Sequence, residues 1–551
     1  MMRTRWNRRQ MLVGGSALAS TLALSRAGLT PRGVLARAQD EPSSGGTLKF
    51  GQTGTPPGYD PQKWWNAAAG IGTSVIGEQL IAIDNYSGER VPTLASAEPT
   101  VENDSTLYTF TLRPDVTFHK GYGTVTAADV KYSWERLMSP ALGAEAGALY
   151  FSIPFVGLQD FLDEKTNEIS GLRAIDDVTF QVELERPDSA FLPTFTYSHA
   201  SIVPRKAVEE MGETFNWNPI GTGPYMIESV DPAQGARLVR NPGYWNPDLP
   251  YIDAIEIAYN VDPELSLLRI QSGEQDLMLE PVPVGSLNDI RDNPDLANQY
   301  FEGPQNDCQW LSLPTQLEPF TDVRVRRAVA MAINKEKLAR VLKGLGDPAT
   351  GGFFSPLSRY YSEGLAYPYD PEGAKALLAE AGYADGFEAP FWGQNQPPYA
   401  DMGPSIQQDL AEIGIQAAWT PMIYDEFIAK SNPGPEAMIV FAWEDAYGHG
   451  SYITDAAFTS AAIENECCNY PRWSSPEFDE MTVAAKSAGE EESIALYQEM
   501  DKIVVQDEVL WVPLLYPKRA DLISARVRGF ETAKYPSGQS KPFARYWLVE
   551  G

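Results

Sequence analysis

The sequence predicts an α/β protein with more than one sheet, and two observations lead to this class. Segments in which apolar and polar residues alternate, as in strands, are interleaved with segments of helical periodicity along the chain. No repeat of about 20–50 residues recurs, which argues against a solenoid or a propeller. With 551 residues, 43% of them hydrophobic, the chain is long enough for about two or three domains.

The first half of the chain is expected to contain mainly strands. Thr126 and Asp129 have the spacing of a capping box, and Val130, Trp134 and Leu137 recur on one side of the helix that would follow. Alternation predicts a first strand at 47–52 and a hairpin at 107–118 that turns at 113–115. Two later strands are predicted at 179–184 and 255–259.

The second half is expected to be richer in helices. One helix should run from Asp322 to about Lys343, with the arginines at 324, 326 and 327 on its solvated face rather than in an anion site. Asp370, Pro371 and Gly382 are expected as the N-cap, the first turn and the stop of another. Further helices are expected at 405–413, from 475 onward and at 490–505, with a strand at 415–419.

The first 38 residues have the parts of an export signal. Arg8 and Arg9 precede a weakly apolar run at 11–24, and small residues stand before the expected cleavage after Ala38. The adjacent arginines indicate the twin-arginine route, and the run is too short for a membrane anchor, which is the alternative. No cysteine precedes Cys308, so no lipid anchor is expected, and residues 39–46 should form a flexible linker.

Charge and motifs argue against a nucleic-acid partner and against catalysis. The formal net charge of −31 repels nucleic acid and anionic lipid. The chain lacks a phosphate-binding loop, a dinucleotide fingerprint, a nucleophile elbow and an H-E-x-x-H motif, so we expect no catalytic residue, metal or cofactor. Gly221 and Gly223 around Thr222 predict a tight scaffold turn that larger residues would obstruct. Cys467 and Cys468 are neighbours; a vicinal disulfide, pairing with the remaining cysteine and free thiols all stay open.

Aromatic residues next to turns form the candidate binding site. The chain has 13 Trp, 26 Tyr and 22 Phe, and several stand beside amides and carboxylates outside any periodic stripe. Flat faces with polar neighbours hold polar solutes in clefts, although packing at domain edges explains them equally well. The candidate ligand-binding residues are Trp65, Trp392, Gln394, Asn395, Tyr399, Trp443, Glu444, Asp445 and Tyr447.

A series of short motifs carries a family resemblance. They are PTLA at 92–95, YTFTLR at 108–113, VTFHKG at 116–121, TAADV at 126–130, NPIGTGPY at 218–225, RNPGYW at 240–245, PYIDAI at 250–255, SGEQD at 272–276, DVRVRRA at 322–328 and the helix at 369–383. In this order, over essentially the whole mature chain, they resemble the family 5 extracellular solute-binding proteins. These are the oligopeptide-, dipeptide- and nickel-binding components of ABC importers.

The resemblance implies a two-lobed periplasmic-binding-protein fold of type II, in its large three-subdomain variant. Lobe I would combine residues 47–303 and 516–551, with an inserted subdomain at about 78–201, and lobe II would span 304–515. Two strands crossing between the lobes would form a hinge, and closure of the cleft would bury the solute. The implied role is that of a monomeric, periplasmic capture protein that delivers its solute to ABC permease subunits and performs no catalysis.

Two departures from the family bear on the solute. Peptide binders of the family place an aspartate three residues after a tryptophan to hold the ligand's ammonium group, but Trp443 is followed at that spacing by Ala446. The alternative is that Asp445 or Glu444 substitutes through a one-residue shift, for which the loop would need a different path. Dipeptide binders use an arginine in the segment that matches 392–402, and this segment has none. A dipeptide is therefore disfavoured. A longer, peptide-like solute is expected. The alternative is an oligosaccharide or other polar solute, and a nickel complex is a minor alternative. The second function class is a secreted hydrolase.

Overall fold

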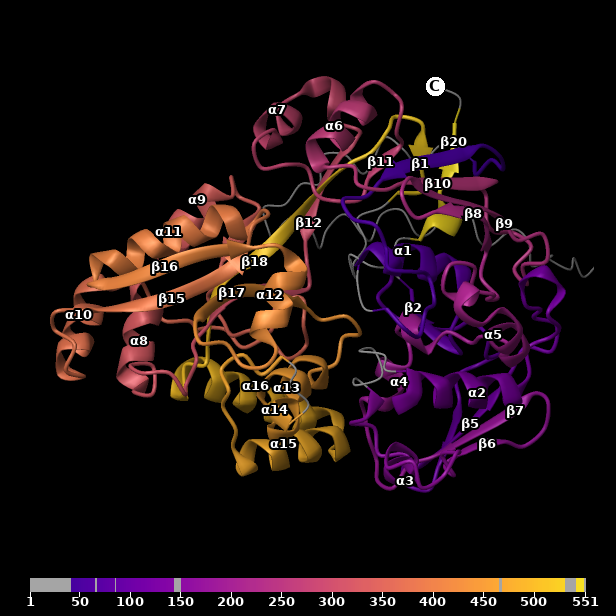
Figure 1. Cartoon of the computed structure of the whole chain (residues 1–551), viewed down its shortest axis with the longest axis horizontal. Coiled ribbons are helices and arrows are strands. Elements are labelled where there is room, and N and C mark those ends of the chain that lie inside the picture. The colour runs from indigo at the N-terminus through magenta and orange to yellow at the C-terminus, as the bar shows by residue number, and fades with distance from the viewer. Residues whose placement is uncertain are drawn as a thin grey trace, which may run out of the picture.

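The computed structural model describes residues 41–64, 67–84, 86–142, 150–464, 468–530 and 542–549. It confirms the two-lobed α/β fold (Figure 1). The lobe with the N-terminal strands, called lobe I, lies on the right of Figure 1, and the lobe with the largest sheet, called lobe II, lies on the left. The expected export signal at 1–38 lies outside the described residues. None of the helices in the described ranges combines the length and apolar character that a membrane crossing requires.

Lobe I is built on a five-stranded sheet in the order β11-β1-β10-β9-β8. The first strand, β1, pairs in parallel with β10 and β11, and Leu48 and Phe50 of β1 lie in its core. Phe543, from the end of the chain, stacks on Phe50 with ring centroids 5.3 Å apart, so the C-terminal segment returns to lobe I. The elements are β1 (Thr47–Gly51), α1 (Ala67–Ile76), β8 (Tyr225–Asp231), β9 (Gly235–Arg240), β10 (Ala254–Ala258), β11 (Leu277–Met278), β19 (Val527–Arg528), η9 (Phe543–Arg545) and β20 (Trp547–Leu548).

A subdomain inserted between α1 and β8 has its own four-stranded antiparallel sheet, β4-β5-β7-β6, and its own core around Trp134. Thr126 and Asp129 form the predicted capping box of α2. The predicted hairpin at 107–118 is wrong, because β5 already has β4 on one edge and β7 on the other. The elements are β2 (Ile81–Ile83), β3 (Arg90–Pro92), β4 (Thr100–Glu102), β5 (Leu107–Thr111), η2 (His119–Gly121), α2 (Ala127–Leu137), η3 (Pro140–Leu142), α3 (Leu158–Leu162), β6 (Leu172–Ala174), β7 (Thr179–Glu183), α4 (Phe191–Thr194), η5 (Ser198–Ala200), α5 (Arg205–Met211) and η6 (Gly212–Asn216).

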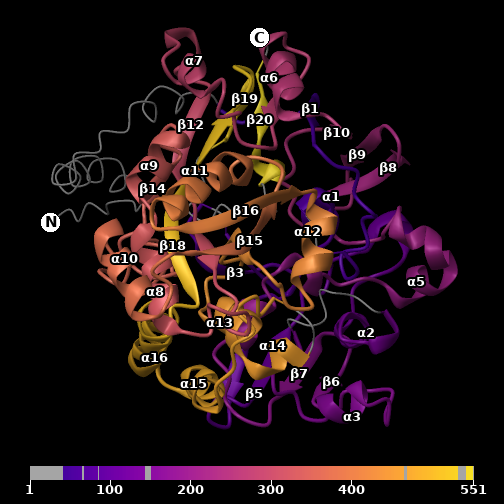
Figure 2. The same ribbon diagram turned by 60° about the vertical axis from the view of Figure 1, so that its left-hand side comes forward.

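Lobe II is a seven-stranded sheet with helices on both faces (Figure 2). Apolar side chains of α8 to α11 pack in the core on one face, and those of α12, α13, α15 and α16 pack in the core on the other. The strands are β12 (Tyr300–Pro304), β13 (Asp307–Ser312), β14 (Gly346–Pro348), β15 (Phe387–Gln394), β16 (Ile415–Met422), β17 (Met438–Glu444) and β18 (Trp511–Leu522). The helices are α8 (Val323–Ala332), α9 (Lys335–Val341), α10 (Pro371–Glu380), α11 (Tyr399–Glu412), α12 (Tyr424–Ser431), α13 (Ser451–Phe458), α14 (Ser460–Glu464), α15 (Pro476–Ser487), α16 (Glu490–Lys502) and the π-turn η8 (Ile503–Asp507).

Two helix predictions in lobe II need correction. The helix expected from Asp322 to Lys343 is two helices, because Ile333 has extended backbone angles and Asn334 caps a new helix through its side chain. Arg326 is not solvated as predicted: it is 3% exposed and donates hydrogen bonds to buried backbone carbonyls. The helix expected at 405–413 begins six residues earlier, at Tyr399, and includes Pro404 in its interior.

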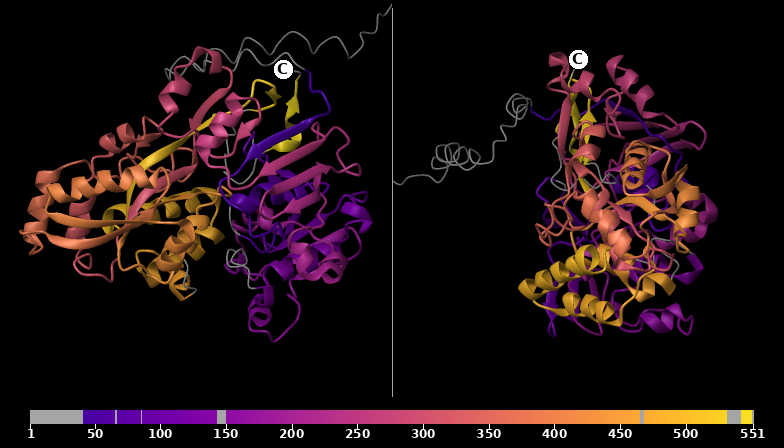
Figure 3. Two further views of the ribbon diagram at one scale, coloured as in Figure 1. Left: turned by 45° about the horizontal axis from the view of Figure 1, so that its top comes forward. Right: turned by 90° about the vertical axis from the view of Figure 1, so that its left-hand side faces the viewer.

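Two neighbouring strands connect the lobes. β18 pairs with β13 of lobe II at its start and with β12 further on, and Ile523 just beyond it bridges Leu277 of the lobe I sheet. Figure 3 (left) shows the long yellow strand β18 leaving lobe II toward lobe I. The boundaries expected at 303/304 and 515/516 fall inside β12 and β18 and stay a prediction. Side chains of α6 (Pro263–Gln271) and α7 (Leu287–Arg291), which precede β12, join the lobe II core together with the short turn η7 (Pro294–Leu296) nearby.

Candidate solute-binding site

The predicted site residues of lobe II gather at one edge of its sheet. β15 runs parallel to β16 and β17, so the carboxyl ends of these three strands meet at this edge, beside the start of the antiparallel β13. The segments that carry the predicted residues follow directly, at 392–399 and 443–447. Open α/β sheets bind ligands at the carboxyl ends of their strands. Trp65, the one candidate from lobe I, lies outside the described residues.

The end of β15 and the segment after it offer one aromatic face and three amide side chains. Trp392 is half-buried, and the ammonium group of Lys430 lies 6.0 Å from its ring centroid. Gln394 is buried and accepts a hydrogen bond of 2.7 Å from the neighbouring Gln396, so its carbonyl oxygen is engaged. Asn395 is exposed at the strand end, and its backbone N–H donates to Met422 of β16. Asn395 therefore has an exposed amide side chain, unlike the buried Gln394.

Tyr399 and Trp443 lie against aromatic neighbours. The ring of Tyr399, at the start of α11, is 5.8 Å from that of Phe441, and burial raises the pKa of its hydroxyl well above the ordinary value. Trp443, at the end of β17, is half-buried with its ring 6.0 Å from Tyr452 and 6.4 Å from Trp511. The backbone of Glu444 pairs with β13, and its side chain lies outside the described part of the structure.

Asp445 closes the loop after β17. Its carboxylate accepts hydrogen bonds from the Gly448 N–H at 2.8 Å and from the Asn306 side chain at 3.4 Å. Burial raises the pKa of Asp445 to about 6, although these hydrogen bonds oppose the increase. The carboxylate is therefore used inside the loop.

Tyr447 links the same loop to lobe I. Its side chain is 5% exposed and its ring lies 4.9 Å from Tyr452. Burial raises the pKa of its hydroxyl, and a hydrogen bond with Thr194 of α4 partly opposes this effect. Tyr447 thus contacts lobe I directly in this closed arrangement.

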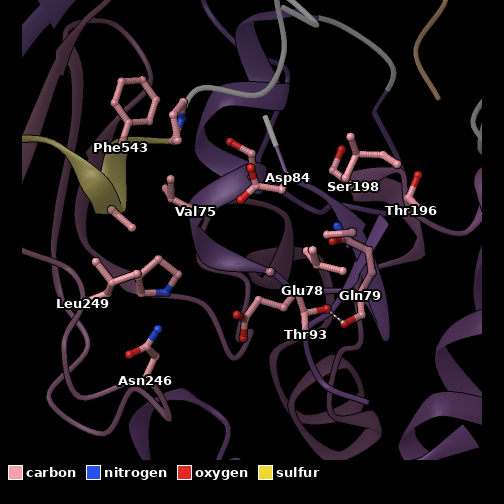
Figure 4. A pocket seen from close by; sticks show the side chains of 18 of the residues that line it. Val75, Glu78, Gln79, Asp84, Thr93, Thr196, Ser198, Asn246, Leu249 and Phe543 are labelled. Atoms are coloured by element: carbon pink, nitrogen blue, oxygen red, sulfur yellow. Dashed lines mark hydrogen bonds between the residues drawn. The ribbon is translucent and has the colours of Figure 1, made fainter. Parts of the chain in front are cut away.

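A cavity of about 420 Å³ lies between lobe I and the tip of this loop. Its walls come from the end of α1, from β2 and β3, from the turn before η5 and from the segment after β9, and Ala446 is the residue that lobe II adds (Figure 4). Ala446 occupies the place where peptide binders of the resembling family carry an aspartate. The cavity therefore has no lobe II carboxylate at that position.

Glu78 organises one wall of the cavity. Its carboxylate accepts hydrogen bonds from Thr222 at 2.9 Å, Tyr244 at 2.8 Å and the indole N–H of Trp245 at 3.0 Å. Burial raises the pKa of Glu78 to about 7, against the lowering effect of these donors and of the Arg113 charge. Glu78 thereby holds two aromatic lining residues in place.

The turn at 221–223 packs against the end of α1, next to Glu78. A Cβ atom on Gly221 would lie 2.1 Å from the carbonyl oxygen of Ile76, and one on Gly223 would lie 2.4 Å from that of Val75. Larger residues cannot fit without moving backbone, which confirms the predicted scaffold turn.

An ion pair forms another part of the lining. Arg545, from the C-terminal segment, lies 2.6 Å from Asp84. Burial by itself raises the pKa of Asp84, but hydrogen bonds from Ser87 and Arg545 outweigh it and hold the pKa below its ordinary value. The cavity therefore presents a carboxylate and a guanidinium side by side.

Sequence reasoning missed most of this lobe I wall. Tyr244 and Trp245 belong to the motif at 240–245, which indicates the family but does not by itself indicate a cavity wall. Asp84 and Arg545 are 461 positions apart, and no local pattern connects them. The RNPGYW motif at 240–245 is the one sequence signal that could have indicated this aromatic pair.

The described cysteines differ in their bonding state. Cys308 is free and buried, and Cys468 is disulfide-bonded, so these two are not paired with each other. Cys467 lies outside the described residues. Within the described ranges, no group of three or more His, Cys, Asp or Glu side chains could hold a metal ion.

Two lobes, strands that cross between them and a cavity at their contact define a solute-binding protein of the hinged, two-lobed class. The chain belongs to the bacterial extracellular solute-binding proteins, family 5, whose model of the middle region matches residues 89–465. It is accordingly an extracytoplasmic protein that binds a small solute and works with the permease of an ABC importer.

Several known proteins are similar to this chain over most of their length. The dipeptide-binding protein of Escherichia coli K12 is 27% identical over 505 residues, covering 88% of this chain and 92% of the relative. The glutathione-binding protein GsiB of Salmonella paratyphi A is 28% identical over 439 residues, covering 78% and 81%. The structure of the Helicobacter pylori periplasmic binding protein DppA with the peptide STSA has a TM-score of 0.79 and 23% identity, covering 92% and 99%. This last likeness establishes the fold.

Proposed function

We propose that this protein captures a peptide-like solute between its lobes and passes it unchanged to the permease. The observation that carries the proposal is the cavity of about 420 Å³ where lobe I meets the loop of Ala446. Small-molecule sites usually enclose about 300–1,000 Å³. The similarity to dipeptide- and glutathione-binding proteins supports a peptide-like solute.

The charges of the site favour a peptide held through its backbone. Ala446 offers no carboxylate for a terminal ammonium group, and the carboxylate of Asp445 is already bonded within its loop. The Asp84–Arg545 pair in the cavity lining supplies polar groups that suit peptide amides or a carboxylate. A short peptide anchored by its free amine is therefore disfavoured.

The experiment is to identify the solute directly. Protein purified from its native host is denatured, and the small molecules released are identified by mass spectrometry; peptides are expected. Ala446→Trp, which fills the cavity, should release little solute, whereas Ala384→Trp on an exposed loop should release as much as the wild type. Equal release from both variants would place the solute elsewhere.

The aromatic wall of the cavity favours one alternative. Tyr197, Tyr244 and Trp245 line it, and flat aromatic faces also stack against sugar rings. A released series of oligosaccharides without peptides would support that solute and contradict the first proposal. Turnover of peptides or glycosides by purified protein, lost in a cavity variant, would instead favour a secreted hydrolase.

The route and state of the protein belong to the same proposal. Arg8 and Arg9 with cleavage after Ala38 would export the folded chain by the twin-arginine route, and the absence of a cysteine before Cys308 would leave it without a lipid anchor. An enclosed periplasm then retains it, as a monomer. Arg8→Lys with Arg9→Lys should leave the precursor in the cytoplasm, and light scattering should report the mass of one chain.

A further inference from the structure

The lobes touch a second time, at the end opposite the connecting strands. In Figure 1, α15 lies at the bottom of lobe II and α4 lies in the lower half of lobe I, whereas β12 and β18 connect the lobes near the top. The Ser189 N–H donates to the carbonyl oxygen of Lys486 at 2.7 Å, and the Ser487 hydroxyl donates to the carbonyl of Pro187 at 3.0 Å. The last carbonyls of a helix lack partners within it, so Ser189 satisfies one of them from the other lobe.

A buried cation lies at this contact. Lys486 is 4% exposed, and its ammonium group lies 2.6 Å from Asp455 of α13 in the same lobe. Asp188 of lobe I is 2% exposed and close enough for the Lys486 charge to lower its pKa, although burial raises it to about 6 overall. One cation thus pairs with a carboxylate of its own lobe and acts through its charge on a carboxylate of the other lobe.

Asp188 has spare bonding capacity toward this cation. One of its oxygens accepts the Ala190 N–H at 2.8 Å. The other is buried and has no hydrogen-bond partner among the described residues. A buried carboxylate oxygen without a donor is stabilised mainly by nearby opposite charge, and Lys486 supplies it together with a smaller contribution from Arg186.

A neutral histidine completes the contact. The Nε2 atom of His449 lies 3.1 Å from the Ser189 hydroxyl, and its Nδ1 atom lies 2.8 Å from Ser451. Burial and the neighbouring charges of Lys486 and Arg359 lower the pKa of His449 to about 3. The imidazole is therefore uncharged at neutral pH and adds a hydrogen bond without opposing the cation.

Each of these contacts between the lobes requires the lobes to be together. Once the lobes separate, Asp188, Lys486 and Ser189 are hydrated and no longer meet, so their mutual bonds favour only the closed arrangement. We propose that Lys486, Asp188 and Ser189 form a latch across the open end of the cleft, which holds the closed lobes in register. The latch goes beyond solute capture, because it acts on closure and its three residues are not among those that line the cavity.

Amide hydrogen exchange tests the latch without knowledge of the solute. The Ser189 amide should be protected in the wild type, and Lys486→Met should speed its exchange at least tenfold while β1 and β17 stay protected. Small-angle scattering should show a larger radius of gyration for the same variant. Lys502→Met, an exposed lysine at the end of α16, is the matched control and should change neither.

Two milder variants keep the test valid if Lys486→Met does not fold. Ser487→Ala removes one hydrogen bond between the lobes from an exposed residue, and Asp188→Asn removes the second carboxylate; each should speed Ser189 exchange by a smaller factor. Exchange of Ser189 at the free-peptide rate in the wild type would overturn the proposal. Equal exchange in wild type and folded variants would overturn it as well, and solute release would still report the proposed function separately.

Discussion

Replacement of Glu78 by glutamine tests how the lobe I wall is held together. The buried carboxylate accepts hydrogen bonds from Thr222, Tyr244 and Trp245. Glu78→Gln keeps the size and one acceptor oxygen but removes the group that titrates. The variant should therefore differ from the wild type in the pH dependence of its stability.

The magnitude follows from the pKa. Burial raises the pKa of Glu78 from 4.5 to about 7, so the folded protein binds this proton more tightly than the unfolded chain. The stabilising effect is complete below pH 4.5 and is lost as the pH rises through 7. At about 1.4 kcal/mol for each pKa unit, the loss amounts to about 3 kcal/mol. Because part of this effect is already lost at pH 5, wild type should lose about 2.5 kcal/mol relative to Glu78→Gln between pH 5 and pH 8.

The assay must follow lobe I alone, because a two-lobed protein need not unfold in one step. Urea unfolding at pH 5 and pH 8, followed by hydrogen exchange of the β1 and β9 amides, gives the free energy of unfolding of this lobe. Glu102→Gln, on the exposed strand β4, is the matched control and should show no such difference. If the free energies of unfolding of wild type and Glu78→Gln differ by the same amount at pH 5 and pH 8, the effect assigned to the burial of Glu78 is wrong.

Three further predictions concern the scaffold. Gly221→Ala places a Cβ atom 2.1 Å from a backbone oxygen and should lower the free energy of unfolding by about 3 kcal/mol or more. Gly54→Ala is the control: its Cβ atom meets nothing within 4 Å, so thermal unfolding should not change. Burial raises the pKa of Asp501 well above its ordinary value, so Asp501→Asn should gain stability over wild type as the pH rises from about 4 to 8; a gain that shrinks with pH contradicts this. Arg326→Met leaves the backbone carbonyls of Glu508 and Phe320 without this donor and should lower the free energy of unfolding of lobe II in urea by about 2–4 kcal/mol. The control Arg324→Met, at an exposed site, should not show this loss.

Local chemistry allowed several elements to be predicted well. The capping box at Thr126 and the cap, proline and glycine around α10 depend on residues only a few positions apart, and the structure contains both. The false hairpin at 107–118 and the undivided helix at 322–343 failed for a different reason. Strand partners from distant segments, and a side-chain cap in mid-pattern, override local periodicity.

The candidate site shows the same division. The residues at 392–399 and 443–447 were chosen one segment at a time, and the parallel pairing of β15 with β16 and β17 brings both segments to one sheet edge. Whether they bind the solute stays a prediction. The cavity wall around Glu78 was not found, because its contacts join residues more than 140 positions apart.

The sequence by itself determined the α/β class, the family motifs and the absence of the ammonium-binding aspartate at Ala446, since each is a matter of residue type and local order. The tertiary structure decided which residues line the cavity and how the lobes meet. Asp84 with Arg545, and Asp188 with Lys486, become neighbours only after the chain has folded. Burial then changes the pKa of such groups, because water is excluded by segments that no local pattern connects.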